Sequence, residues 1–232
     1  MNADNSIDLH YWPTPNGWKA AIMLEELGIP YHLHWVDIRA GDQHREEFLR
    51  ISPNNRVPAI VDREGPDGES ISVFESGAIL LYLARKFGRF LPVDARRRVA
   101  TEEWLMWQMG GLGPMAGQAH HFRIYAPETI RYAVERYTRE CARLYGVMDR
   151  RLEGREYLAD EYSIADMACV GWVSAHERQG QDLNHFPNLR AWFERVSARP
   201  AVERALALGR DIREGSDPKD AATQANMFGR PA

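Results

Sequence analysis

Three short polar turns carry the side chains of this sequence that are best suited to bind a small charged molecule. The candidates are Thr14 and Asn16 in TPNG, Val57 and Pro58 in RVPAI, and Glu75 and Ser76 in FESGA. A hydroxyl and an amide can donate hydrogen bonds to an anion, and a carboxylate can bind an ammonium group. Each turn also has a simpler interpretation, because Thr, Asn and Ser are ordinary helix N-caps and an acid at a helix N-terminus is common.

Taken together, the turns predict a ligand of definite shape. The N-terminus of a helix binds a carboxylate, and the carboxylate of Glu75 would bind an ammonium group. The bond between Val57 and Pro58 can be cis, which would turn the Val57 backbone outward so that it pairs with an extended peptide. A ligand with an amino-acid head, a peptide backbone and a third, reactive group would satisfy all three turns.

The elements that would position these turns alternate over the first 90 residues. Apolar periodicity and turn residues predict strands at 7–12, 31–38, 58–62 and 70–75 and helices at 16–27, 44–52 and 76–88. The order βαβαββα predicts an α/β domain with a parallel pair of strands and an antiparallel hairpin. In such a fold the three turns would meet at one end of the sheet.

The rest of the chain has helical patterns only. Helices are expected at 94–115, 127–152, 163–180 and 187–197, with a short one after Pro200. We therefore predict an α/β plus all-α protein with a first domain at 1–89, a helical domain at 94–208 and a polar tail at 209–232. YSIAD predicts a capping box between Ser163 and Asp166, a structural role for this acid.

Composition excludes several classes of function. The chain has 232 residues, 44% of them hydrophobic, and a net charge of -4, whereas nucleic-acid binders are usually basic. No apolar run approaches the length of a membrane span, and MNADNSIDLH does not have the pattern of a signal peptide. The two cysteines, Cys141 and Cys169, lie in helical patterns as isolated thiols, so we expect them to be buried and the protein to be cytoplasmic.

Other patterns give weaker indications. His120 and His121 are adjacent, so on a helix they point about 100° apart, and no Cys, His and carboxylate pattern completes a metal site. GGLG lacks the Lys and Ser or Thr of a phosphate-binding loop. The Trp- and Met-rich stretch EEWLMWQMGGLGPM fits core packing, or in part an apolar pocket for a second substrate.

The chain resembles the cytosolic glutathione transferases over about residues 7–208. The resemblance rests on NRVPAIVD, FESGAILLYLARKF and YSIADMACVGWV, and TPNGWK and WQMGGLGPMAGQAHHF are similar to the bacterial nu class. It implies a thioredoxin-like first domain that binds glutathione as co-substrate, without a metal. It also implies a homodimer in which the first domain of one chain lies against the helical domain of the other.

The resemblance also implies a role for each candidate residue. Val57 would pair with the cysteinyl part, Glu75 and Ser76 would hold the γ-glutamyl group, and Gln43 would reach the glycyl end. Arg136 matches an arginine near bound glutathione, although a solvated charge on a helix face is the alternative. Thr14 and Asn16 would face the sulfur, and Tyr11 is a less favoured donor because it lies within a strand.

In this interpretation the nucleophile belongs to the ligand. A free thiol has a pKa of roughly 8.5, and hydrogen bonds at the positive end of a helix favour the thiolate. The nu-class resemblance implies reduction of a small disulfide by glutathione. Conjugation to an electrophile, reduction of a peroxide and a non-catalytic regulatory module remain alternatives.

Overall fold

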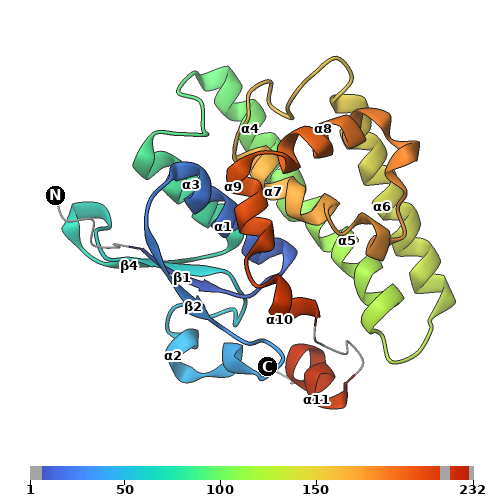
Figure 1. Cartoon of the computed structure of the whole chain (residues 1–232), viewed down its shortest axis with the longest axis horizontal. Coiled ribbons are helices and arrows are strands. Elements are labelled where there is room, and N and C mark those ends of the chain that lie inside the picture. The colour runs from blue at the N-terminus through green and yellow to red at the C-terminus, as the bar shows by residue number, and fades with distance from the viewer. Residues whose placement is uncertain (1–6, 215–219, 230–232) are drawn as a thin grey trace. The chain divides into compact units, whose positions relative to one another are not determined.

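The computed structural model describes residues 7–214 and 220–229, which Figure 1 draws as ribbons. They form two compact units: the first combines the chain up to Leu83 with the described residues from Arg204 onward, and the second runs from Ala84 to Glu203. The division between the two units falls inside the helix Ser76–Phe87, and it groups the described residues of the C-terminal segment with the first unit.

The first unit is built on a four-stranded mixed sheet. Its order is β2-β1-β3-β4, formed by β1 (Ile7–Tyr11), β2 (Tyr31–Trp35), β3 (Ala59–Asp62) and β4 (Ile71–Phe74). Strand β1 is parallel to β2 and antiparallel to β3, and β4 is antiparallel to β3. The predicted mixed sheet of βαβαββα order is therefore confirmed.

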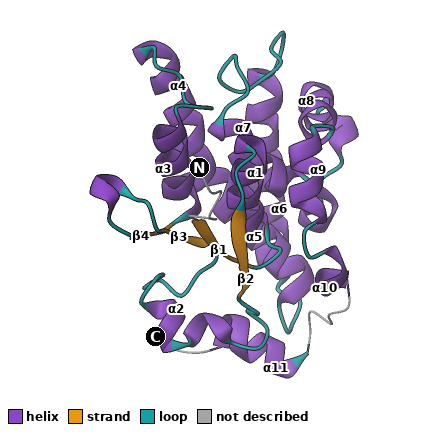
Figure 2. Cartoon of the chain, turned by 60° about the vertical axis from the view of Figure 1, so that its left-hand side comes forward, coloured by secondary structure: helices purple, strands orange, loops and turns teal. Residues whose placement is uncertain are grey.

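Helices cover both faces of this sheet. Figures 1 and 2 show α1 (Pro15–Leu27) and α3 (Ser76–Phe87) on one face and the short α2 (Glu46–Leu49) on the other. Side chains alternate along β1: Ile7, Leu9 and Tyr11 are fully buried, and His10 contacts Phe48 of α2. This alternation follows from the two-residue period of a strand that has a packed layer on each side.

The second unit is helical in its described residues. It contains α4 (Ala95–Trp107), α5 (Gly113–His120), α6 (Arg131–Arg151), α7 (Ile164–Val173) and α8 (Pro187–Ser197), and α9 (Pro200–Ala207) begins there. All ten residues of α7 are buried, and this helix packs against α4, α5 and α8. A helix with apolar residues all round its surface must lie in the interior, so α7 is the core of this unit.

Three helix boundaries in the second unit differ from the sequence expectation. The helix predicted at 163–180 ends at Val173, and a separate 3₁₀ turn follows at His176–Gln179. The segment predicted at 94–115 continues to Tyr125, because π-helical turns at Gln108–Leu112 and His121–Tyr125 extend the chain on either side of α5. The helix predicted at 127–152 begins at Arg131, preceded by Ile130 with a non-helical ψ of 89°. Wide helical turns of this kind have no strong signal in a sequence.

The capping box at the start of α7 is confirmed. Ser163 accepts a hydrogen bond from the Ala165 backbone, and Asp166 accepts one from the Ser163 backbone at 3.1 Å. The same buried carboxylate also accepts hydrogen bonds from the backbone of Leu158 at 3.1 Å and from Nε1 of Trp192 at 2.8 Å. Asp166 therefore joins a helix start, a loop and helix α8 through one side chain.

We predict that Asp166→Ala destabilises the protein by about 3 kcal/mol or more, because it leaves buried donors of Leu158, Ser163 and Trp192 without an acceptor. Asp94→Ala, which removes an exposed N-cap of α4, is the matched control and should cost about 0.5–2 kcal/mol. Urea unfolding of the two variants measures the difference. Equal losses would contradict the central role of Asp166.

Candidate functional site

The pairing of three strands brings the predicted turns to one end of the sheet. His10 near the end of β1 pairs with Ala59 at the start of β3, and Ala59 pairs with Phe74 at the end of β4. TPNG follows β1, the Val57–Pro58 bond precedes β3, and Glu75 follows β4. The expectation that the three turns meet at one end of the sheet is confirmed.

Thr14 caps α1, and its hydroxyl can still donate a hydrogen bond to a ligand. Its Oγ1 accepts a hydrogen bond from the Gly17 backbone at 3.0 Å, and its own backbone is extended before Pro15. Gly17 is required at this place because a Cβ there would lie 2.2 Å from the carbonyl oxygen of Trp12. A hydroxyl both accepts and donates, so the Thr14 proton can bind an anion beside the half-buried Asn16.

The second turn contains a cis peptide bond between Val57 and Pro58, as the sequence suggested. Val57 is half-buried, and its N–H and C=O have no hydrogen-bond partner within residues 7–214 and 220–229. An unpaired backbone edge of this kind can add an extended peptide as a further strand would. The backbone of Val57 is therefore unpaired among the described residues, and its role in binding a peptide stays a prediction.

The third turn has a strained backbone. Glu75 has a φ of 67°, in the left-handed region that residues other than glycine rarely occupy. Such strain is kept where the surrounding structure demands it, and functional sites are the usual place. Glu75 is exposed and accepts a hydrogen bond from Nδ2 of Asn54 at 3.3 Å, and Ser76 begins α3 with 4% of its surface exposed.

Two polar neighbours of this turn were missed by the sequence analysis. Lys19, only 1% exposed, donates from Nζ to Oγ of Ser76 at 3.3 Å, so a positive charge lies behind the start of α3. Its signal was a lone charge within the apolar run GWKAAIML. Asn54, the partner of Glu75, lies in the polar loop just before Val57.

Gln43 lies elsewhere in the first unit, in the short 3₁₀ turn Asp42–His44 before α2. Its side chain is buried, and Nε2 donates to the carbonyl oxygens of Ile38 at 3.2 Å and of Asn226 at 2.9 Å. The same nitrogen lies 3.3 Å from Nε2 of His44, so the amide is already engaged with its own loop and with the C-terminal segment.

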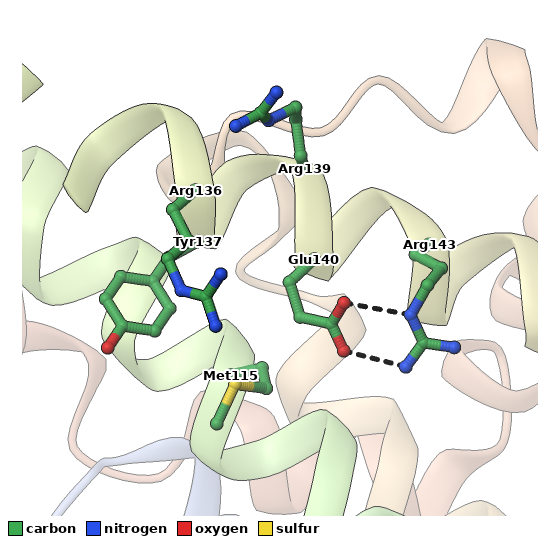
Figure 3. Close-up of a pocket in the computed structure, with 6 residues that line it drawn as sticks. All are labelled: Met115, Arg136, Tyr137, Arg139, Glu140 and Arg143. Atoms are coloured by element: carbon green, nitrogen blue, oxygen red, sulfur yellow. Dashed lines mark hydrogen bonds and ion pairs between the residues drawn. The ribbon is translucent and has the colours of Figure 1, made fainter. Parts of the chain in front are cut away.

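Arg136 lies on α6 in the second unit and lines a cavity of about 470 Å³. Figure 3 shows its guanidinium directed toward Met115, and the lining also includes Tyr137, Arg139, Glu140 and Arg143. Glu140 forms a two-point ion pair with Arg143, at 2.7 and 2.8 Å, and this partner lowers the pKa of the Glu140 carboxyl. Three arginines against one glutamate leave an excess of positive charge, which suits an anionic ligand.

Neither cysteine is placed to react. Cys141 and Cys169 are buried, as predicted, and neither forms a disulfide bond. Cys141 donates a hydrogen bond to Oε1 of Gln179, and burial raises the pKa of its thiol to about 12. Since the thiolate is the reactive form, this thiol is inert at neutral pH.

No group of three or more His, Cys, Asp or Glu side chains within the described residues could hold a metal ion. Burial lowers the pKa of His120 to about 4, so its ring is neutral at physiological pH, and it contacts the ring of Tyr125. Across the same residues, none of the helices combines the length and the apolar character needed to span a membrane.

Two sequence models of known families match the chain. One, for the glutathione S-transferase N-terminal domain, matches residues 14–86, and the other, for the glutathione S-transferase C-terminal domain, matches residues 112–200. This chain belongs to the glutathione S-transferase family. The fold described above is accordingly the thioredoxin-like domain and the helical domain of a glutathione S-transferase.

Three relatives indicate which glutathione S-transferases this chain is similar to. Disulfide-bond oxidoreductase YfcG of Escherichia coli is 56% identical over 202 residues, which cover 86% of this chain and 94% of YfcG. A glutathione transferase from Pseudomonas putida, solved with one glutathione disulfide bound per subunit, has a TM-score of 0.83 and 42% identity, covering 89% of this chain and 93% of that one. One from Burkholderia graminis, with two glutathione molecules per subunit, has a TM-score of 0.84 and 44% identity, covering 90% and 91%.

Proposed function

We propose that this protein reduces small disulfides with glutathione, which binds at the three turns of the first unit. The proposal rests on three features that meet at one end of the sheet. They are a helix N-terminus with Thr14 and Asn16, an unpaired backbone at Val57 and a carboxylate at Glu75. This set matches a thiolate, a peptide backbone and an ammonium group. The oxidoreductase activity of YfcG and the glutathione-bound relatives support the same assignment.

The proposed contacts follow the parts of the ligand. The γ-glutamyl ammonium binds the Glu75 carboxylate, and its carboxylate binds at Ser76, where α3 begins. The cysteinyl backbone pairs with Val57, next to the cis bond to Pro58. Gln43 is the proposed partner of the glycyl end. Arg136 is the proposed partner of a second anionic group.

The proposed chemistry needs no protein thiol. Thr14 and Asn16 donate hydrogen bonds to the glutathione sulfur at the positive end of α1, which stabilises the thiolate. This thiolate attacks one sulfur of a disulfide RSSR, forms a mixed disulfide and releases RS⁻, which takes up a proton. The thiolate of a second glutathione then attacks the glutathione sulfur, which yields glutathione disulfide and the second RSH.

Binding to immobilised glutathione, followed by a turnover assay, tests this proposal. The full chain is supplied with glutathione and a small disulfide, and the glutathione disulfide formed is counted by recycling. Turnover with an electrophilic carbon or a peroxide, but not with the disulfide, would instead favour conjugation or peroxide reduction. Binding without any turnover would indicate a regulatory module.

We further propose that the protein is cytoplasmic and acts as a homodimer. Strand β4 lies at an edge of the sheet and exposes the apolar side chains of Ile71 and Phe74. Exposed apolar groups on an edge strand are a common feature of surfaces that pair with another chain. Sedimentation analysis of the purified chain measures the oligomeric state.

We predict that Asn16→Ala lowers turnover by roughly 10- to 100-fold with little change in glutathione affinity, because it removes a donor that acts on the thiolate. Rates and the dissociation constant of glutathione measure the two effects separately. A lower melting temperature with unchanged turnover would mean that Asn16 only supports the helix start.

We predict that Glu75→Ala weakens glutathione binding by roughly 10- to 100-fold, because it removes the counter-charge to the γ-glutamyl ammonium. Glu69→Ala, an exposed acid in the hairpin before β4, is the matched control and should bind normally. Titration calorimetry compares the variants with glutathione and with N-acetylglutathione, whose amine is blocked. An equal loss for both ligands would count against the ammonium contact.

We predict that the double variant Cys141→Ser, Cys169→Ser keeps most of its disulfide reductase activity and loses about 1–2 kcal/mol of stability through disturbed packing. The physical reason is that both thiols are buried in the helical unit. The recycling assay measures activity, and urea unfolding measures stability. A variant that folds and binds glutathione but does not turn over would show that a protein thiol takes part.

A further inference from the structure

The C-terminal segment Asp220–Gly229, which contains α11 (Ala221–Gln224), lies against the loop that carries Gln43. Figures 1 and 2 both show α11 on the side of the sheet where α2 lies. This segment is beyond the part of the chain that the family models match, which ends at residue 200. The proposed function gives it no role.

One residue of this segment makes three hydrogen bonds to the loop. The backbone carbonyl oxygen of Asn226 accepts a hydrogen bond from Nε2 of Gln43 at 2.9 Å and lies 3.2 Å from Nε2 of His44. The side-chain Nδ2 of Asn226 donates to the carbonyl oxygen of Arg39 at 2.6 Å. Gly41 allows this approach, since a Cβ there would lie 3.1 Å from Oδ1 of Asn226. Asn226 therefore fits this loop through three polar contacts and a close approach to Gly41.

The contact uses the donors that a carboxylate would need. The amide of Gln43 has two N–H bonds, which it donates to the carbonyl oxygens of Ile38 and Asn226, and the same nitrogen lies 3.3 Å from Nε2 of His44. Its Oε1 is buried and has no hydrogen-bond partner among the described residues. While the segment is docked, both N–H bonds of Gln43 are used within the chain, and neither is left for a carboxylate.

His44 is engaged in the same way. Its Nδ1 lies 3.1 Å from the side-chain amide nitrogen of Asn55, which donates, so Nδ1 accepts. Nε2 is then the ring nitrogen that donates to the carbonyl oxygen of Asn226. A single backbone carbonyl thus occupies a donor from Gln43 and one from His44.

The chain shortly before this segment is also bound to the first unit. Tyr11 donates to the carbonyl oxygen of Leu208 at 3.2 Å, and Arg39 donates to that of Ile212 at 3.1 Å. These bonds fix the chain shortly before the segment begins. A segment tethered in this way can compete with a free ligand, because its effective concentration near the loop is high even though it makes few contacts.

We propose that Asn226 and the segment around it compete with the glycyl carboxylate of glutathione for the donors of Gln43. Docking of the segment weakens the binding of ligands that end in this carboxylate, and its release restores the donor. The segment thereby determines affinity for the glycyl end of the ligand alone. This inference rests on the proposed function, which assigns the glycyl end to Gln43.

The test compares the full chain with a variant that ends at Lys219 and keeps the bonds to Leu208 and Ile212. Calorimetry measures glutathione and γ-glutamylcysteine, which lacks the glycyl residue. We expect the shortened chain to bind glutathione about 3- to 10-fold more tightly, since the binding-competent fraction rises, and to bind γ-glutamylcysteine as before. In a Gln43→Ala background the gain should disappear.

A variant that ends at Gly229 is the control for shortening and should bind both ligands as the full chain does. Unchanged or weaker glutathione binding after removal of residues 220–232, or an equal gain for both ligands, would overturn this inference alone. Absence of binding of both ligands to both proteins would overturn the proposed function as well.

Hydrogen exchange on the full chain gives a second measurement that does not depend on the folding of the shortened variant. Glutathione should increase exchange of the backbone amides at 225–229, and γ-glutamylcysteine should not. Equal protection of these amides with and without glutathione would contradict the competition.

Discussion

The candidate site depends on one constraint, the antiparallel pairing of β3 between β1 and β4. This pairing aligns His10, Ala59 and Phe74 across the sheet. The start of α1, the cis bond before Pro58 and the strained backbone after β4 therefore lie at the same end of the sheet. A register shift of one residue would turn every side chain of β3 to the other face. The burial of Ala59 and Ile60 against the two packed layers therefore fixes the site as well as the fold.

The electrostatics of the first unit suit a ligand that brings its own nucleophile. The start of α1 presents backbone dipoles and the Thr14 hydroxyl, and the buried ammonium of Lys19 lies behind Ser76 at the start of α3. Positive potential at these two places favours a thiolate and a carboxylate. The thiols of the chain lie in the other unit, buried, where a thiolate is disfavoured.

Much of the fold could be predicted from local patterns. The alternation of strands and helices, the capping box of Ser163 and Asp166 and the cis bond before Pro58 all come from residues that interact with near neighbours in sequence. The boundaries of α5 and α6 could not be predicted, because the π-helical turns beside α5 and the non-helical backbone before Arg131 have no strong signal in a local pattern.

The sequence by itself determined the types and order of the elements and the three polar turns, because periodicity and turn chemistry act over a few residues. Only the tertiary structure decided which distant groups meet. Lys19 reaches Ser76, 57 positions away, and Gln43 reaches Asn226, 183 positions away. No local pattern encodes these pairs, since the folding of the whole first unit brings their atoms within hydrogen-bond distance.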